Sequence, residues 1–309
     1  MPKPFLNYDE QIYKLEHEKN LIINNRPFAY QQLRKIGYFS LISGYKDIFK
    51  IPITKEYIPG VTFEEIMVLY QFDENLRTLF FKYILHIEQN MKELLSYSFC
   101  KKHGESQKAY LNINHYEKSK RGVNRLLGVL HNIVYNNSSY IYINHMREVH
   151  GNIPLWVLTN ILTFGIISKM YQFSTSSIQS KICKNFPYLN EKQLEQLLSV
   201  VTKFRNVCAH NERLFSYKTT DKIPDLKLHE KLSIPKINNT YIFGKKDLFA
   251  IVIAFRYLLP KDEFRQFKSD LSKLIHQLLK NSSHINQSLL FEQMGFPNNW
   301  ETITRYRKI

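Results

Sequence analysis

The chain has 309 residues, and 43 Lys and Arg against 27 Asp and Glu give it a formal net charge of +16. Only 10 glycines and 11 prolines are present, too few for a turn-dense β fold or a long disordered linker, so we expect an all-α protein. Three cysteines cannot form a disulfide framework, and no apolar run follows the N-terminus as in a signal peptide, which favours a cytoplasmic location.

Capping signals predict the helices near the N-terminus. The segment Asn7-Tyr8-Asp9-Glu10 has the pattern of a capping box and predicts a helix to about residue 19. Pro27 opens a second helix that Gly37 ends. The residues from 38 to 59 are less regular. Pro59-Gly60 then marks the end of an N-terminal helical extension, residues 1–60.

The longest helical pattern begins at Thr62-Phe63-Glu64-Glu65, another capping box, and extends to about residue 102. Its apolar residues recur at helical spacing. Glu88 lies beside this stripe. It could hold Arg205 through a bidentate pair, or it could face solvent and pair with Lys92 four residues later.

Shorter helical patterns follow at 117–134, 140–149, 154–173 and 177–186. The first of them carries a basic group that is our candidate phosphate-binding strip outside the motif described next: Lys118, Lys120, Arg121 and Arg125. The alternative is an ordinary solvated helix face.

A third polar cap, Asn190 with Gln193, opens a helix that we expect to end near residue 209. Arg205 falls inside its apolar stripe, where an arginine is costly unless it is paired or faces an interface. His210 follows five residues later, about 140° further round a regular helix. The two side chains therefore share a site only if the helix ends near Cys208 or if a second copy supplies the other half. The alternative is purely structural: His210 would cap the end of the helix and Arg205 would extend to the surface, with no shared site.

The remaining chain predicts a surface excursion at 216–240, helices at 245–259 and 262–280, and two short terminal helices separated by Gly295-Phe296-Pro297. We expect this C-terminal helical region, 216–309, to form one compact unit with the core at 61–215. The end of the chain, Arg305-Tyr306-Arg307-Lys308, is basic.

Several kinds of chemistry lack support in the sequence. No phosphate-binding loop or dinucleotide fingerprint is present. Cys100 with His103, and His145 with His150, are isolated pairs without the second half of a zinc site, so we expect no metal and no cofactor. The longest weakly polar run, 153–168, is shorter than the ~20 residues of a membrane span, so we expect no membrane partner.

The basic charge predicts an anionic partner. The chain also has 21 Phe, 20 Tyr and 2 Trp, whose rings can stack on unpaired bases, which makes nucleic acid the natural candidate. The alternative is that the aromatic residues form the core and the lysines only keep the protein soluble.

The segment Arg205-Asn206-Val207-Cys208-Ala209-His210 resembles the R-N-x-C-A-H signature of the Abi family, the AbiD/AbiF-like abortive-infection proteins. Asn160 stands where that family would have a glutamate. Other stretches resemble family segments in the same order: Lys3-Pro4-Phe5-Leu6, Leu41-Ile42-Ser43-Gly44-Tyr45, Phe72-Asp73 with Leu76-Arg77, Ile87-Glu88, Pro154-Leu155-Trp156-Val157, and Leu162-Thr163-Phe164-Gly165.

The resemblance implies membership of the HEPN superfamily, whose ribonucleases carry an R-x4-6-H motif. The implied fold is a HEPN-type helical bundle at 61–215 with helical additions at both ends. The implied function is antiphage abortive infection by a metal-independent endoribonuclease toxin that a structured noncoding RNA holds in check. One motif per chain is half of the usual site, so the resemblance implies a homodimer.

The resemblance also implies roles for individual residues. His210 would act as general base or acid, Arg205 would stabilise the phosphate and Asn206 would orient it, with Glu88 in support. Lys203 and Arg213 flank the motif and would contact RNA. Two alternatives stay open: a non-catalytic RNA-binding module, and a protein-interaction effector of phage defence.

Overall fold

The structure is a computed structural model that describes residues 4–54, 56–136 and 138–306. Lys3 and the basic residues at 307–308 lie outside the described residues. Within them the elements are helical except for one small hairpin, which confirms the all-α class. The buried apolar residues form one continuous cluster that extends from Ile12 to Ile303.

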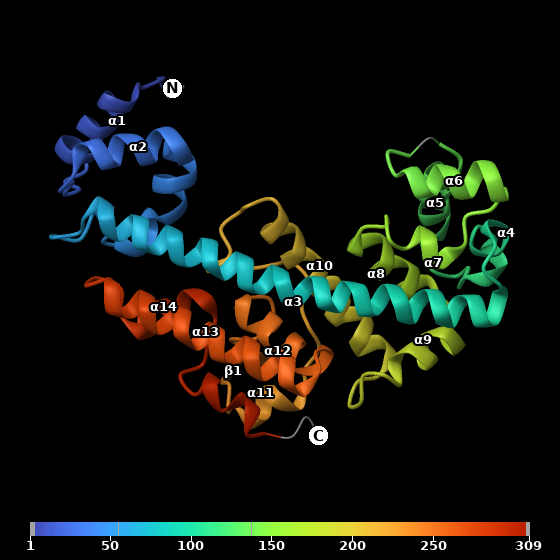
Figure 1. The fold of residues 1–309 in the computed structure, drawn as a ribbon. Helices are drawn as coiled ribbons and strands as arrows, with labels where there is room; N and C mark the ends of the chain where they lie inside the picture. The colour runs from blue at the N-terminus through green and yellow to red at the C-terminus, as the bar shows by residue number, and fades with distance from the viewer. Residues whose placement is uncertain (1–3, 55, 137, 307–309) are drawn as a thin grey trace.

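One helix of 41 residues, α3 (Phe63–His103), runs through the molecule (Figure 1), and helices from both the middle and the C-terminal part of the chain pack along it. The predicted capping box is confirmed: the Thr62 side chain accepts a hydrogen bond from the Glu65 N–H, and the Glu65 carboxylate accepts one from the Thr62 N–H. Gly104 ends the helix at a φ of +83°, where a residue with a Cβ is disfavoured.

The N-terminal elements also match the capping signals. They are α1 (Tyr8–Tyr13), the π-helix η1 (Lys14–Glu18), α2 (Arg26–Ile36), the π-helix η2 (Phe39–Ser43) and the 3-10 helix η3 (Lys46–Phe49). Asn7 caps α1 and Gly37 ends α2 with a φ of +87°. The less regular stretch from residue 38 therefore folds into two short helical turns, one π and one 3-10.

The middle of the chain contains α4 (Gln107–Tyr110), η4 (Ile113–His115), α5 (Val123–Tyr135), α6 (Ile141–His150), α7 (Leu155–Leu158), α8 (Phe164–Phe173) and α9 (Ser176–Cys183). The prediction of a helix from 117 is wrong at its start. The Glu117 N–H donates to the Phe173 carbonyl at 2.8 Å, and Gly122 has a φ of +103°. The chain is thus tied to the end of α8 until Gly122, and α5 begins only afterwards.

The prediction of one helix over 154–173 is also wrong, because the segment forms two helices. The Asn160 side chain donates to the carbonyls of Trp156 and Val157 and so satisfies the end of α7. Thr163 then caps α8 by accepting from the Ile166 N–H. Two polar side chains in a largely apolar run therefore end one helix and begin the next.

The C-terminal part contains α10 (Glu191–Ala209), α11 (Lys227–Lys231), α12 (Leu248–Leu258), α13 (Lys261–Asn281), α14 (Gln287–Met294) and η5 (Trp300–Thr304). Strands β1 (Lys236–Ile237) and β2 (Thr240–Tyr241) pair antiparallel, with Lys236 opposite Tyr241. The expected surface excursion at 216–240 is only partly correct. Ile223, Leu228 and His229 are buried, because these residues pack inward between the exposed lysines.

Aromatic rings join α3 to the C-terminal helices. The ring centroid of Phe267 on α13 lies 5.1 Å from that of Phe80 on α3 and 4.9 Å from that of Phe255 on α12. Such edge-to-face contacts add to the free energy gained from burial. None of the helices in the described part of the chain combines the length and apolar character needed to cross a membrane.

The carboxylate of Glu65 fixes the segment after α13 to the start of α3. It accepts hydrogen bonds from the N–H groups of Ser283 (2.8 Å) and His284 (3.1 Å), and the His284 ring nitrogen Nδ1 lies 2.7 Å from its second oxygen. Burial alone would raise the pKa of Glu65, but the hydrogen bonds from His284 and Ser283 bring that pKa below its ordinary value.

A group whose pKa falls on folding stabilises the protein fully above its unfolded pKa, which is 4.5 here, and that contribution is lost as the pH drops through the folded value. We therefore expect Glu65→Gln to lower the free energy of unfolding at neutral pH by about 1–3 kcal/mol. It should also make stability fall less steeply below pH 4.5. Urea unfolding across acidic pH measures both, with Glu74→Gln on the exposed side of α3 as control. Parallel pH curves for wild type and Glu65→Gln would contradict this account.

Candidate functional site

The motif lies at the C-terminal end of α10. The expected cap is confirmed: the Gln193 N–H donates to the Asn190 side chain at 2.8 Å, and the Asn190 N–H donates to the Gln193 side chain at 2.9 Å. The helix ends at Ala209, as the sequence predicts. His210 follows directly, and its N–H still donates to the Asn206 carbonyl at 2.9 Å. Asn211, with a φ of +56°, then turns the chain away.

Arg205 is turned toward α3 and is half-buried. Its Nε lies 3.6 Å from Oε2 of Glu88, and its guanidinium carbon lies 5.7 Å from the centroid of the Phe81 ring. The second oxygen of Glu88 lies 2.9 Å from Nζ of Lys92. The two partners that the sequence offered for Glu88 thus meet at one buried carboxylate.

The detailed geometry corrects two parts of that expectation. The Arg205 pair is not bidentate, because 3.6 Å from Nε alone is longer than a hydrogen bond. Glu88 does not face solvent either, since its side chain is only 7% exposed. Among the described residues neither Nε of Arg205 nor Oε2 of Glu88 has a hydrogen-bond partner. Arg205 and Glu88 therefore form an ion pair without a hydrogen bond between them. The outer nitrogens of the guanidinium have no described hydrogen bond.

Asn206 and His210 are exposed, unlike Arg205. They are four residues apart and so lie on one side of the helix end. In the described part of the chain no contact joins the side chains of Arg205 and His210. A single copy therefore presents its arginine toward α3 and its histidine toward solvent, as the 140° separation predicts.

A buried network that sequence reasoning did not identify as functional fixes the segment after the motif. Asp73 on α3 is fully buried, and its carboxylate accepts hydrogen bonds from the N–H groups of Leu214 (3.0 Å) and Phe215 (2.7 Å). The Tyr45 hydroxyl and Arg77 Nη1 each donate to the same carboxylate at 2.7 Å. The Leu41–Tyr45 stretch, α3 and the post-motif segment are thus held together at one point.

Two further hydrogen bonds extend this network toward the motif. Arg77 also donates to the carbonyl of Glu212 at 3.4 Å, and the Arg213 guanidinium donates to the carbonyl of Gly44. Residues 212–215, which follow His210, are therefore held both to α3 and to the segment around Gly44. Phe72-Asp73 with Leu76-Arg77 is the only sequence signal that could have indicated this, and its spacing places Asp73 and Arg77 one turn apart.

The cysteine of the motif is not a nucleophile at neutral pH. Burial raises the pKa of the Cys208 thiol to about 12, and the nearby Asp73 carboxylate adds to the shift. Such a thiol stays protonated, and the thiolate is the reactive form.

The predicted basic group is only partly helical. Lys118, Lys120 and Arg121 lie in the turn that precedes α5, and Arg125 lies in the first turn of that helix. Lys120 is partly used internally, since its Nζ donates to the Gln172 carbonyl on α8. Lys118, Arg121 and Arg125 are exposed, as is Lys203 on α10.

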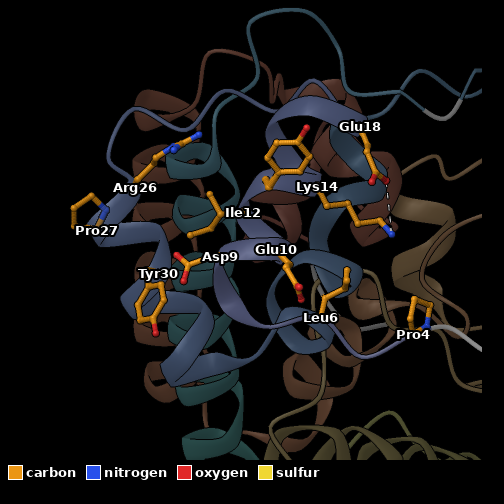
Figure 2. Close-up of a pocket in the computed structure, with 11 residues that line it drawn as sticks. Pro4, Leu6, Asp9, Glu10, Ile12, Lys14, Glu18, Arg26, Pro27 and Tyr30 are labelled. Carbon is orange, nitrogen blue, oxygen red and sulfur yellow. Dashed lines mark ion pairs between the residues drawn. The ribbon is translucent and has the colours of Figure 1, made fainter.

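No group of three or more His, Cys, Asp or Glu side chains among the described residues is placed to hold a metal ion. A pocket of about 880 Å³ lies far along the chain from the motif, between α1, η1 and α2 (Figure 2). Its charged residues include Asp9, Glu10, Lys14 and Arg26, and none of its lining residues belongs to α3 or α10. It is therefore separate from the candidate site.

The Asp73 network yields a stability test. Replacing a buried, paired carboxylate leaves Arg77 without its partner, so we expect Asp73→Asn to lower the free energy of unfolding by about 3–5 kcal/mol. The amide protons of Leu214 and Phe215 should exchange faster with solvent, because both donate to Asp73. Denaturant unfolding and hydrogen exchange measure these effects. Glu74→Gln, one residue away and exposed, should change neither. Unchanged protection of both amides would refute the assignment.

The comparisons with known proteins agree with this architecture. A family model described as Abi-like protein matches residues 31–216, which is more than half of the chain. No curated protein and no solved structure gives a significant match. The matched range begins in α2, includes α3 with Asp73 and Glu88, and ends just after the segment that Asp73 holds. The helix that carries Arg205 and His210 and the long helix it packs against are thus both within the match, and the chain belongs to the Abi-like protein family.

Proposed function

We propose that this protein is an antiphage abortive-infection toxin that acts as a metal-independent endoribonuclease of the HEPN type on cytoplasmic RNA. Membership of the Abi-like family supports the abortive-infection part of this proposal. The observation that carries the nuclease part is the end of α10, where Asn206 and His210 are exposed and Arg205, on another side of the helix, faces Glu88. The net charge of +16 suits a polyanionic substrate.

RNA supplies its own nucleophile in this reaction. His210 accepts the proton of the 2′-hydroxyl, and the 2′-oxygen forms a bond to the adjacent phosphorus while the bond from phosphorus to the 5′-oxygen breaks. The departing 5′-oxygen takes a proton from a protonated histidine. The products are a 2′,3′-cyclic phosphate and a 5′-hydroxyl, and neither an oxidant nor a metal ion is needed. Histidine suits both roles, because it accepts and releases protons near neutral pH.

The other motif residues act on the phosphate. The outer nitrogens of Arg205 stabilise the negative charge that develops on the phosphate oxygens, and Asn206 orients the group by hydrogen bonding. The contact with Glu88 limits the rotation of the guanidinium, so its direction is set before RNA binds. Lys203 and Arg213, beside the motif, neutralise neighbouring phosphates.

A homodimer completes the site in this proposal. One chain turns Arg205 toward α3 and leaves His210 exposed, so two motifs that face each other supply an acid and a base at one phosphate. The basic surface also suits a structured noncoding RNA that holds the toxin in check until infection. Both partners are part of the proposal and rest on the family resemblance; the single motif and the charge are compatible with them.

One observation favours a second candidate function, a non-catalytic RNA-binding protein. Arg205 already faces a buried carboxylate, which competes with a phosphate for its charge. In that case Arg205 and His210 would only hold RNA, and growth arrest would arise from sequestration.

The two functions are separated by His210→Ala. We expect the purified wild-type protein to cut RNA in the presence of EDTA and to leave 2′,3′-cyclic phosphate ends, and the variant to cut at least about 100-fold more slowly with RNA binding retained. Induced expression should arrest growth and fragment RNA in wild type only. His276→Ala, an exposed histidine on α13, is the matched control. Equal arrest by wild type and His210→Ala with intact RNA would favour the binding protein.

A further inference from the structure

A polar groove runs between α8 and α10 on the side of the molecule that carries the basic group. Two adjoining hollows of about 740 and 360 Å³ form it, and they share Gln172 and Glu195. The first begins at Lys120 and Arg121 in the turn before α5, and the second ends at Asp221 and Lys222 beyond α10. The groove thus connects the basic turn to the flank of the motif helix.

The residues of α10 that line the groove share a helix face with the exposed part of the motif. Taking Ser199 as reference and about 100° per residue, Lys192 and Glu195 of the groove lie within roughly 40° of it. Asn206 and His210 lie within roughly 20° of Ser199 on the same helix face. Arg205 lies about 120° away, which agrees with its contact to α3. The groove wall and the exposed half of the motif are therefore one surface, and Ser199 is about 16 Å from His210 along the axis.

The lining of the groove fits an anionic chain that also carries hydrogen-bonding bases. Five cations line it against three carboxylates. Two of the carboxylates are engaged within the protein: Glu195 lies 3.0 Å from Nζ of Lys192, and Asp221 accepts from the Ser199 hydroxyl at 2.7 Å. The lining also contains amide side chains, most of which are hydrogen-bonded within the protein: Gln179 donates to the carbonyls of Tyr171 and Gln172, Gln172 donates to Glu195, and Asn190 caps α10. Gln196 has no described hydrogen bond, so its amide can donate and accept toward a base edge.

The groove lies over two helices that pack directly on each other, α8 and α10, and the axes of such helices lie about 8–10 Å apart. We expect a groove on that scale to hold one strand. Unpaired RNA also exposes the base edges that amide side chains can recognise. Phe173 is the aromatic residue of the lining, and it is buried beneath the groove.

We infer that the groove between α8 and α10 is the binding track for single-stranded RNA, which it leads from Arg121 along α10 to His210. This inference rests on the proposed function and adds the path and the strand state of its substrate. Lys222 at the far end, outside the basic group recognised from sequence, contacts a phosphate in this arrangement.

The test uses the full chain with His210→Ala, so that RNA stays intact, and an unstructured oligouridylate as probe. Lys222→Glu should weaken binding about three- to tenfold and reduce the salt dependence of log K by about 0.7 per lost phosphate contact. Lys261→Glu makes the same charge change in the first turn of α13, which lies on the other side of α3 from α8 in Figure 1, and should leave affinity unchanged. A photocrosslinking residue at Gln196 should label the probe, and one at Lys261 should not.

The outcomes separate this inference from the function on which it rests. Equal affinities for Lys222→Glu and Lys261→Glu, without a crosslink at Gln196, would overturn the track while RNA cleavage by the wild type stands. Binding of duplex or folded RNA only would overturn the assignment to a single strand. Failure of the wild type to bind or cut any RNA would overturn the proposed function, and the track with it.

Discussion

The buried carboxylate of Asp73 is the constraint on which the candidate site depends. It receives two backbone N–H groups from the segment after the motif, a tyrosine hydroxyl from the N-terminal part and a guanidinium from its own helix. A buried charge is tolerated only when such donors surround it, so these four contacts must form together. The chain beyond His210 is thereby given one direction, although His210 itself is exposed and makes no such contact.

A second electrostatic centre, Glu88, fixes the other half of the motif. Its two oxygens face different cations, Arg205 from α10 and Lys92 from α3. The two cations together carry one more charge than the single carboxylate balances. Nε of Arg205 and Oε2 of Glu88 are both buried without a hydrogen-bond partner among the described residues, so charge alone pairs them.

The proposed nuclease and the proposed RNA track use different faces of α10. The side of α10 that faces α3 provides the anchored arginine, and the side that faces solvent provides the groove wall, Asn206 and His210. A helix separates its faces rigidly, so these functions do not compete for space. A second copy is needed in this scheme because a regular helix cannot bring residues five apart to one phosphate.

The sequence by itself determined the local features of this protein. The capping patterns at Asn7, Thr62 and Asn190 predicted three helix starts, and the spacing of Arg205 and His210 predicted that their side chains diverge, because both depend on neighbouring residues in one helix. It also offered Glu88 as a partner of Arg205. The prediction of a helix at 117–121 was wrong, because the Glu117 N–H donates to the carbonyl of Phe173, far along the chain.

Only the tertiary structure decided which polar residues act together. Asp73 and Leu214 are 141 residues apart, and no local pattern indicates that one carboxylate will receive the other's N–H. The sharing of Glu88 by Lys92 and Arg205, and the groove between α8 and α10, likewise arise where separate helices meet. Helix formation is set largely by short-range sequence, whereas the position of a buried charge and the shape of a groove are set by the packing of the whole chain.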